Sequence, residues 1–140
     1  MKSCVLDASV VAAAFFQEEH ADAARRLLVS DRELHAPDLI YAELANVIWK
    51  RQRRGEIDER EASRLLADIL RLPLRITPSE ELVENALQLA LATGLTVYDC
   101  LYVALTVQTK GVMVSGDQRL LNALADSPLA KNVAWIGAQH

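Results

Sequence analysis

Short apolar runs alternate along the chain with longer segments whose apolar residues recur every three or four positions. The short runs are rich in β-branched or aliphatic residues and are bounded by polar or turn-forming residues, which is typical of strands. They predict five strands, at residues 3–6, 33–36, 74–77, 112–115 and 133–136.

The longer segments have the 3.6-residue spacing of amphipathic helices. The clearest helix covers residues 38–54, where Pro37 and Asp38 give a start signal and Gly55 gives a stop signal. Six further helices are predicted at residues 8–16, 20–29, 58–72, 79–92, 97–108 and 118–125.

Strands that alternate with helices or helix pairs require crossover connections, and these favour a mostly parallel sheet covered on both faces. The chain has 140 residues, of which 51% are hydrophobic, enough for one sizeable core. We therefore expect one α/β domain over residues 1–140, without internal repeats.

Its apolar runs, such as residues 10–16 and 101–107, are far shorter than the roughly 20 residues that span a bilayer. The first residues lack the pattern of a signal peptide, so we expect a cytoplasmic protein without membrane attachment. Cys4 and Cys100 form no CxxC pair, which predicts buried reduced thiols. The three histidines lack metal-binding spacing, so any metal would be held by oxygen.

Charge adds one local feature. The net charge of −4 argues against binding nucleic acid over the whole surface. A basic cluster, consisting of Lys50, Arg51, Arg53 and Arg54, closes the helix of residues 38–54. It is either the solvated end of a helix, where cations suit the helix dipole, or a local contact for a polyanion.

Two carboxylates follow strands directly. Asp7 comes after the strand of residues 3–6, and Asp117 follows the strand of residues 112–115 after one glycine. Ligands bind at the carboxyl edge of open parallel sheets, so the two carboxylates would meet there if their strands are neighbours. Each could instead be an ordinary helix N-cap.

Two other carboxylates lie within helices. Glu43 borders the buried stripe of its helix, so it is either a rim residue reaching solvent or a ligand in a cleft. Asp99 interrupts the mostly apolar stretch TVYDCLYVAL, three residues after Thr96. This spacing fits a capping box, which would explain Asp99 without any function.

Several carboxylates brought together repel one another unless a cation neutralises them. Oxygen-only ligands suit Mg²⁺ or Mn²⁺, which can activate water toward a phosphoryl centre. Ser9 and Ser115, each two residues from a candidate carboxylate, could support the site by donating a hydroxyl to the water or phosphate; ordinary turn hydrogen bonds would also explain them.

Four motifs in order resemble the PIN domain, and most closely the VapC-type toxin endoribonucleases. They are VLDASV (5–10), PDLIYAELANVIWK (37–50), TVYDCLYVALT (96–106) and VSGDQRLL (114–121). The resemblance implies a PIN-like three-layer α/β/α sandwich with a central, mostly parallel sheet of about five strands. It also implies a metal site formed by Asp7, Glu43, Asp99 and Asp117, with Mg²⁺ or Mn²⁺ as cofactor. Ser115 stands where the family commonly has threonine, which keeps the hydroxyl.

The implied activity is metal-dependent endonuclease cleavage of single-stranded or loop RNA by the toxin of a toxin–antitoxin module. A homodimer and a VapB-like antitoxin partner are implied too. Asp7, Asp99 and Asp117 would hold the metal, and Glu43 would be a further ligand or the base that orients water. The basic cluster would lie about 10 to 17 Å from the metal and guide the RNA backbone. Arg119 is a nearer candidate for RNA contact.

Three alternatives differ in their expected residues. A phospho-receiver domain would need adjacent acidic residues after the first strand, whereas Ala8 follows Asp7. A haloacid-dehalogenase-type phosphatase would have a second aspartate at the position of Ser9. A PIN fold that binds RNA or a partner without cutting becomes the better interpretation when acidic positions are lost, and all four are present.

Overall fold

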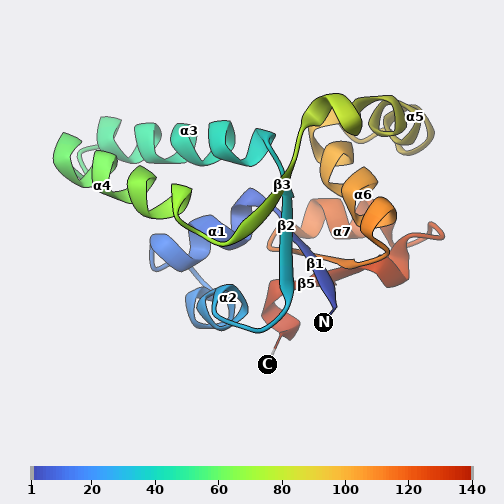
Figure 1. Ribbon diagram of the computed structural model, residues 1–140, viewed down its shortest axis with the longest axis horizontal. Helices are drawn as coiled ribbons and strands as arrows, with labels where there is room; N and C mark the ends of the chain where they lie inside the picture. The colour runs from blue at the N-terminus through green and yellow to red at the C-terminus, as the bar shows by residue number, and fades with distance from the viewer. Residues whose placement is uncertain (1, 140) are drawn as a thin grey trace.

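The computed structural model describes residues 2–139 and contains one parallel sheet between two layers of helices (Figure 1). The strand order is β3-β2-β1-β4-β5, and every neighbouring pair runs parallel. The strands are β1 (Ser3–Leu6), β2 (Glu33–Pro37), β3 (Leu74–Thr77), β4 (Val112–Ser115) and β5 (Val133–Trp135). The predicted α/β sandwich with a five-stranded sheet is therefore confirmed.

Within residues 2–139 seven α-helices flank the sheet, and Figure 1 shows α1 to α4 on one side of it and α5 to α7 on the other. The first face carries α1 (Ala8–Phe15), α2 (Ala21–Leu28), α3 (Leu39–Arg53) and α4 (Glu59–Leu70). The second face carries α5 (Val83–Thr93), α6 (Val97–Thr109) and α7 (Gln118–Leu124).

Most predicted boundaries lie within two residues of the observed ones, and at two places an element ends in a different local structure. The helix predicted for residues 79–92 begins as a separate 3-10 turn, Ser79–Glu81, and Leu82 at the break is buried before α5 starts. The last strand ends at Trp135, because Ile136 turns into a 3-10 segment that buries its side chain. In both places the burial of one apolar side chain interrupts the regular element.

The core lies on both sides of β1, whose Cys4, Val5 and Leu6 are fully buried. On the second face, α6 is buried continuously from Cys100 to Thr106. Both cysteines are free and buried, as predicted. Asp7, the residue after β1, therefore lies directly beside the apolar core.

Within residues 2–139, no one helix is long and apolar enough to cross a membrane. The helices α5 and α6 reach that length and apolarity only when they are joined as a pair, and this pair is bent by 113°.

Candidate active site

Asp7 is the most buried carboxylate of the predicted set, at 8% exposure. It ends β1 and caps α1, since its Oδ1 accepts a hydrogen bond from the Val10 N–H at 3.4 Å. The hydroxyls of Ser9 and Ser115 donate to its two carboxylate oxygens. Burial raises the pKa of Asp7, and the charge of Asp117 adds to the rise, while the two serine hydrogen bonds lower it.

The same two serines connect the ends of β1 and β4. The Gly116 N–H donates to Ser9 Oγ at 2.9 Å, and the Asp117 N–H donates to Ser115 Oγ at 3.0 Å. Because β1 and β4 are parallel neighbours, with Leu6 paired to Val114, their ends lie together. The serines form the turn hydrogen bonds that one interpretation expected, and their hydroxyls donate to Asp7.

Asp117 is the N-cap of α7, as one interpretation of the sequence expected. Its Oδ1 accepts hydrogen bonds from the backbone N–H groups of Arg119 at 3.0 Å and Leu120 at 3.3 Å. The other oxygen, Oδ2, points to the guanidinium of Arg119, with its Nη2 at 3.2 Å. Capping thus uses one oxygen and leaves the second for the site.

Glu43 on α3 is half-buried and lies near enough to Asp7 and Asp99 for their charges to act on it. Its Oε1 accepts a hydrogen bond from the hydroxyl of Tyr102, a residue of α6 that is 3% exposed. Burial raises the pKa of Glu43, the Tyr102 hydrogen bond lowers it, and the charges of Asp7 and Asp99 raise it further. These contacts favour a cleft position over a rim position.

Sequence reasoning assigned no role to Tyr102. It lies three residues after Asp99, on the same side of α6, so the helical spacing was available as a signal. Its partner is 59 residues away in the chain, and only the packing of α3 near α6 shows the contact. Burial and the nearby Glu43 raise the pKa of Tyr102, so it stays a hydrogen-bond donor.

The structure corrects the capping-box hypothesis for Asp99. Thr96 caps α6, since its hydroxyl accepts from the Asp99 N–H at 3.1 Å. In the part of the chain that the structure describes, the Thr96 N–H makes no return bond to the Asp99 carboxylate, whereas Asp58 and Glu61 form a complete box at the start of α4. The Asp99 carboxylate instead accepts from Arg119 Nη2 at 2.9 Å.

The four carboxylates therefore come from separate elements and gather at the carboxyl edge of the sheet. Asp117 raises the pKa of Asp7, Asp7 and Asp99 raise that of Glu43, and Arg119 joins Asp99 to Asp117. Over residues 2–139, no three acidic, histidine or cysteine side chains stand close enough to be a finished metal site. The donors are all carboxylate oxygens, which suits Mg²⁺ or Mn²⁺, but Arg119 lies between two of them.

The family model of the PIN domain matches residues 4–126. This chain belongs to the PIN domain family. "Ribonuclease VapC3" from Pyrobaculum aerophilum is 39% identical over 118 residues, which cover 83% of this chain and 90% of that protein. The resemblance seen in the four motifs is thereby confirmed.

Two solved structures have the fold of this PIN domain. The crystal structure of PAE2754 from Pyrobaculum aerophilum matches with a TM-score of 0.74 and 24% identity, over 97% of this chain and 85% of that one. A toxin-antitoxin complex from Klebsiella pneumoniae matches with a TM-score of 0.63 and 13% identity, over 94% of this chain and 95% of that one.

The basic cluster of the PIN domain is divided in its contacts. Arg51 forms ion pairs with Glu18 at 2.6 Å and Glu56 at 3.2 Å, and its guanidinium lies over the ring of Phe16. Arg51 therefore pairs with groups at the end of α3, the Arg53 guanidinium lies over the exposed ring of Trp49, and Lys50 and Arg54 are exposed.

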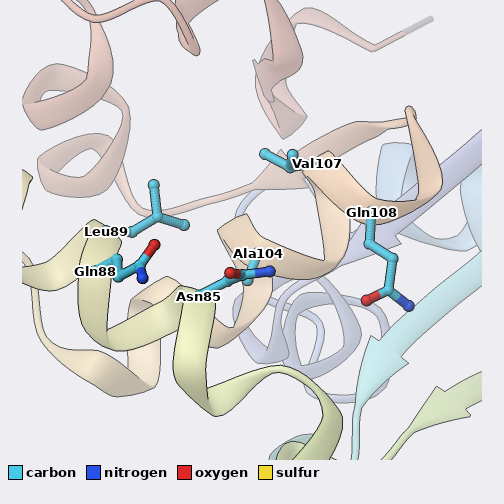
Figure 2. Close-up of a pocket in the computed structure, with 6 residues that line it drawn as sticks. All are labelled: Asn85, Gln88, Leu89, Ala104, Val107 and Gln108. Carbon is cyan, nitrogen blue, oxygen red and sulfur yellow. The ribbon is translucent and has the colours of Figure 1, made fainter.

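Two pockets of the PIN domain differ in the side chains that line them. A pocket of about 450 Å³ between α5 and α6 is lined by amide and apolar side chains: Asn85, Gln88, Leu89, Ala104, Val107 and Gln108 (Figure 2). A second one, of about 360 Å³, is lined by Leu39, Ala42, Glu43, Asn46 and Tyr98. The lining of the second pocket includes Glu43 of the proposed site, whereas the lining of the first includes no acidic, basic or histidine side chain.

Proposed function

We propose that this PIN domain is a metal-dependent endoribonuclease and the toxin of a toxin–antitoxin pair. The observation that carries the proposal is the convergence of Asp7, Glu43, Asp99 and Asp117 at one sheet edge, with Asp7 almost completely buried. Its relative named "Ribonuclease VapC3" supports RNA as the substrate.

The buried charge needs a counter-ion. An ionised carboxylate beside other carboxylates is unfavourable in a low-dielectric position unless a cation compensates it. Asp7, Asp99 and Asp117 would hold Mg²⁺ or Mn²⁺, directly or through water, and Glu43 would be a further ligand or a base. When bound, such an ion would supply charge neutralisation and a more acidic water.

Glu43 would orient the attacking water and accept its proton. Its raised pKa brings it closer to the working range of a general base, and the Tyr102 hydrogen bond fixes one of its oxygens. Attack by water, and not by a ribose 2′-hydroxyl, leaves a 5′-phosphate and a 3′-hydroxyl. A cyclic phosphate product would contradict this mechanism.

The acidic site repels RNA, so cations outside it must attract the backbone. Lys50, Arg53 and Arg54 at the end of α3 supply such charges. Ser9 and Ser115 would support the site by holding the carboxylate of Asp7.

We also propose two protein partners, a second copy of the chain and a VapB-like antitoxin. The similarity to a structure described as a toxin-antitoxin complex supports the second of these. The proposed setting is the cytoplasm, where RNA and the antitoxin are present.

The direct test incubates the purified protein with a pool of cellular RNA in the presence of Mn²⁺ or EDTA, and analyses the new RNA ends. We expect Mn²⁺-dependent cuts with 5′-phosphates, and none from Asp7→Asn or Asp99→Asn. Equal cutting by these variants would refute the site assignment. RNA binding without cutting by the wild type would indicate a non-cleaving PIN domain.

A further inference from the structure

One nitrogen atom joins two of the proposed metal ligands. Nη2 of Arg119 lies 2.9 Å from Asp99 Oδ2 and 3.2 Å from Asp117 Oδ2. Asp99 comes from α6 and Asp117 from the start of α7, so the guanidinium joins two elements. Arg119 is itself the second residue of α7, and its backbone N–H is held by Asp117 Oδ1.

The contacts of Asp117 determine which oxygen a metal could use. Its Oδ1 already accepts two backbone N–H bonds that start α7, so Oδ2 is the oxygen left for a metal. This is the oxygen that Arg119 occupies. A divalent ion held by Asp117 would need Oδ2, the oxygen that Nη2 of Arg119 contacts, so the ion and the guanidinium would compete for the same atom.

We propose that Arg119 is a resident counter-cation that competes with the divalent metal for Asp99 and Asp117. This inference rests on the proposed metal-dependent function. In the metal-free protein the guanidinium offsets the repulsion between the two carboxylates, and metal binding displaces it. Arg119 thereby sets the metal concentration at which the site fills.

Arg119 is able to leave without rearranging the fold. Its side chain is 63% exposed, compared with 26% for Asp99 and 37% for Asp117. Its backbone stays fixed at the start of α7, so the displaced guanidinium remains beside the site. The RNA contact predicted for Arg119 from the sequence becomes available to it only after the metal has taken its place.

The test measures Mn²⁺ binding by titration calorimetry for the wild type and for Arg119→Gln. Removal of the guanidinium should tighten Mn²⁺ binding by about 3- to 30-fold. The apparent affinity for the metal decreases as the fraction of molecules in which Arg119 occupies the carboxylates increases. Arg119→Lys, which keeps the charge but not the planar fork, should fall between the two. Arg71→Gln, which removes an exposed i,i+3 pair with Asp68, is the matched control and should bind like the wild type.

A thermal readout separates competition from a general effect of charge. In EDTA, Arg119→Gln should unfold a few degrees below the wild type, because its carboxylates are no longer bridged. In saturating Mn²⁺ the two proteins should unfold at the same temperature, since Arg119 has then left the site in the wild type and is absent from the variant. An equal loss in both conditions would show that Arg119 keeps its pairs in the metal-bound form, which would overturn the proposal.

The outcomes also separate this inference from the proposed function. Unchanged or weaker Mn²⁺ binding by Arg119→Gln, with normal binding by the wild type, would overturn the competition and leave the metal site intact. Failure of both proteins to bind Mn²⁺ would overturn the metal site itself, and this inference with it. If Asp7 belongs to the metal site, Asp7→Asn should bind Mn²⁺ more weakly than the wild type, whether or not Arg119 competes with the metal.

Discussion

Asp7 illustrates, at the scale of one residue, how a site can oppose stability. It ends the central strand, is nearly fully buried, and has a raised pKa because of that burial. The folded protein therefore holds a proton on Asp7 more tightly than the unfolded chain does. Between the ordinary aspartate pKa of about 4 and the raised value, the free energy of unfolding falls as pH rises.

This sign gives a stability prediction for Asp7→Asn in EDTA. Asparagine carries no charge to bury, so at neutral pH the variant should unfold at the same temperature as the wild type or a few degrees higher. The difference should vanish below about pH 4, where Asp7 is protonated in both states. Thermal unfolding at several pH values measures this difference. A variant clearly less stable than the wild type at pH 7 would show that the buried carboxylate of Asp7 does not lower the stability of the fold.

Tyr102 gives a second residue-scale prediction, on the general base. The hydroxyl lost in Tyr102→Phe normally lowers the pKa of Glu43, so this pKa should rise further in the variant. We expect about 10-fold slower cleavage near neutral pH and a rising limb of the pH–rate profile displaced to higher pH. Tyr41→Phe, on the same helix as Glu43, is the control. An unmoved profile would show that the hydrogen bond does not tune Glu43.

Helix starts show, at the scale of elements, which contacts local sequence predicts. The caps at Asp7 and Asp117, and the cap hydroxyl of Thr96, follow from spacing within three residues. Asp38 and Asp99 differ, because their carboxylates bind partners 41 and 20 residues away, Ser79 and Arg119. Local pattern cannot predict such contacts, since they depend on how separate elements pack.

The basic end of α3 leads to an element-scale prediction. Replacing Lys50 and Arg54 together by alanine should weaken RNA binding about equally for different sequences and reduce the slope of log affinity against log salt by about 1.4. Binding measured at several salt concentrations checks this, with Arg26→Ala and Arg71→Ala combined as a charge-matched control. An unchanged slope would show that RNA does not pass over this end of α3.

The order of the strands explains the site at the scale of the whole molecule. From β1 the chain moves outward through β2 to β3, and it then crosses back to β4 on the other side of β1. The carboxyl ends of β1 and β4 form the switch point where ligands enter open α/β sheets. The sequence predicted the five strands and the carboxylates at their ends, but strand order depends on tertiary packing. The sequence therefore predicted that Asp7 and Asp117 meet only if β1 and β4 are neighbours, and the structure shows that they are.

We propose that the carboxylates at this edge perform chemistry and do not merely start helices. Thr96 and Asp99 offer a matched pair at one helix start, where the hydroxyl caps α6 and the carboxylate faces the site. Loss of an N-cap costs about 1 kcal/mol, so Thr96→Ala should unfold about 3 to 5 °C lower and cleave RNA at nearly the wild-type rate.

The decisive measurement is the rate of Mn²⁺-dependent RNA cleavage by Asp99→Asn, taken together with its thermal midpoint. We predict a midpoint within a few degrees of the wild type and a cleavage rate reduced by about 100-fold or more. A folded Asp99→Asn variant that cleaves RNA at the wild-type rate would contradict the assignment of this edge as the active site.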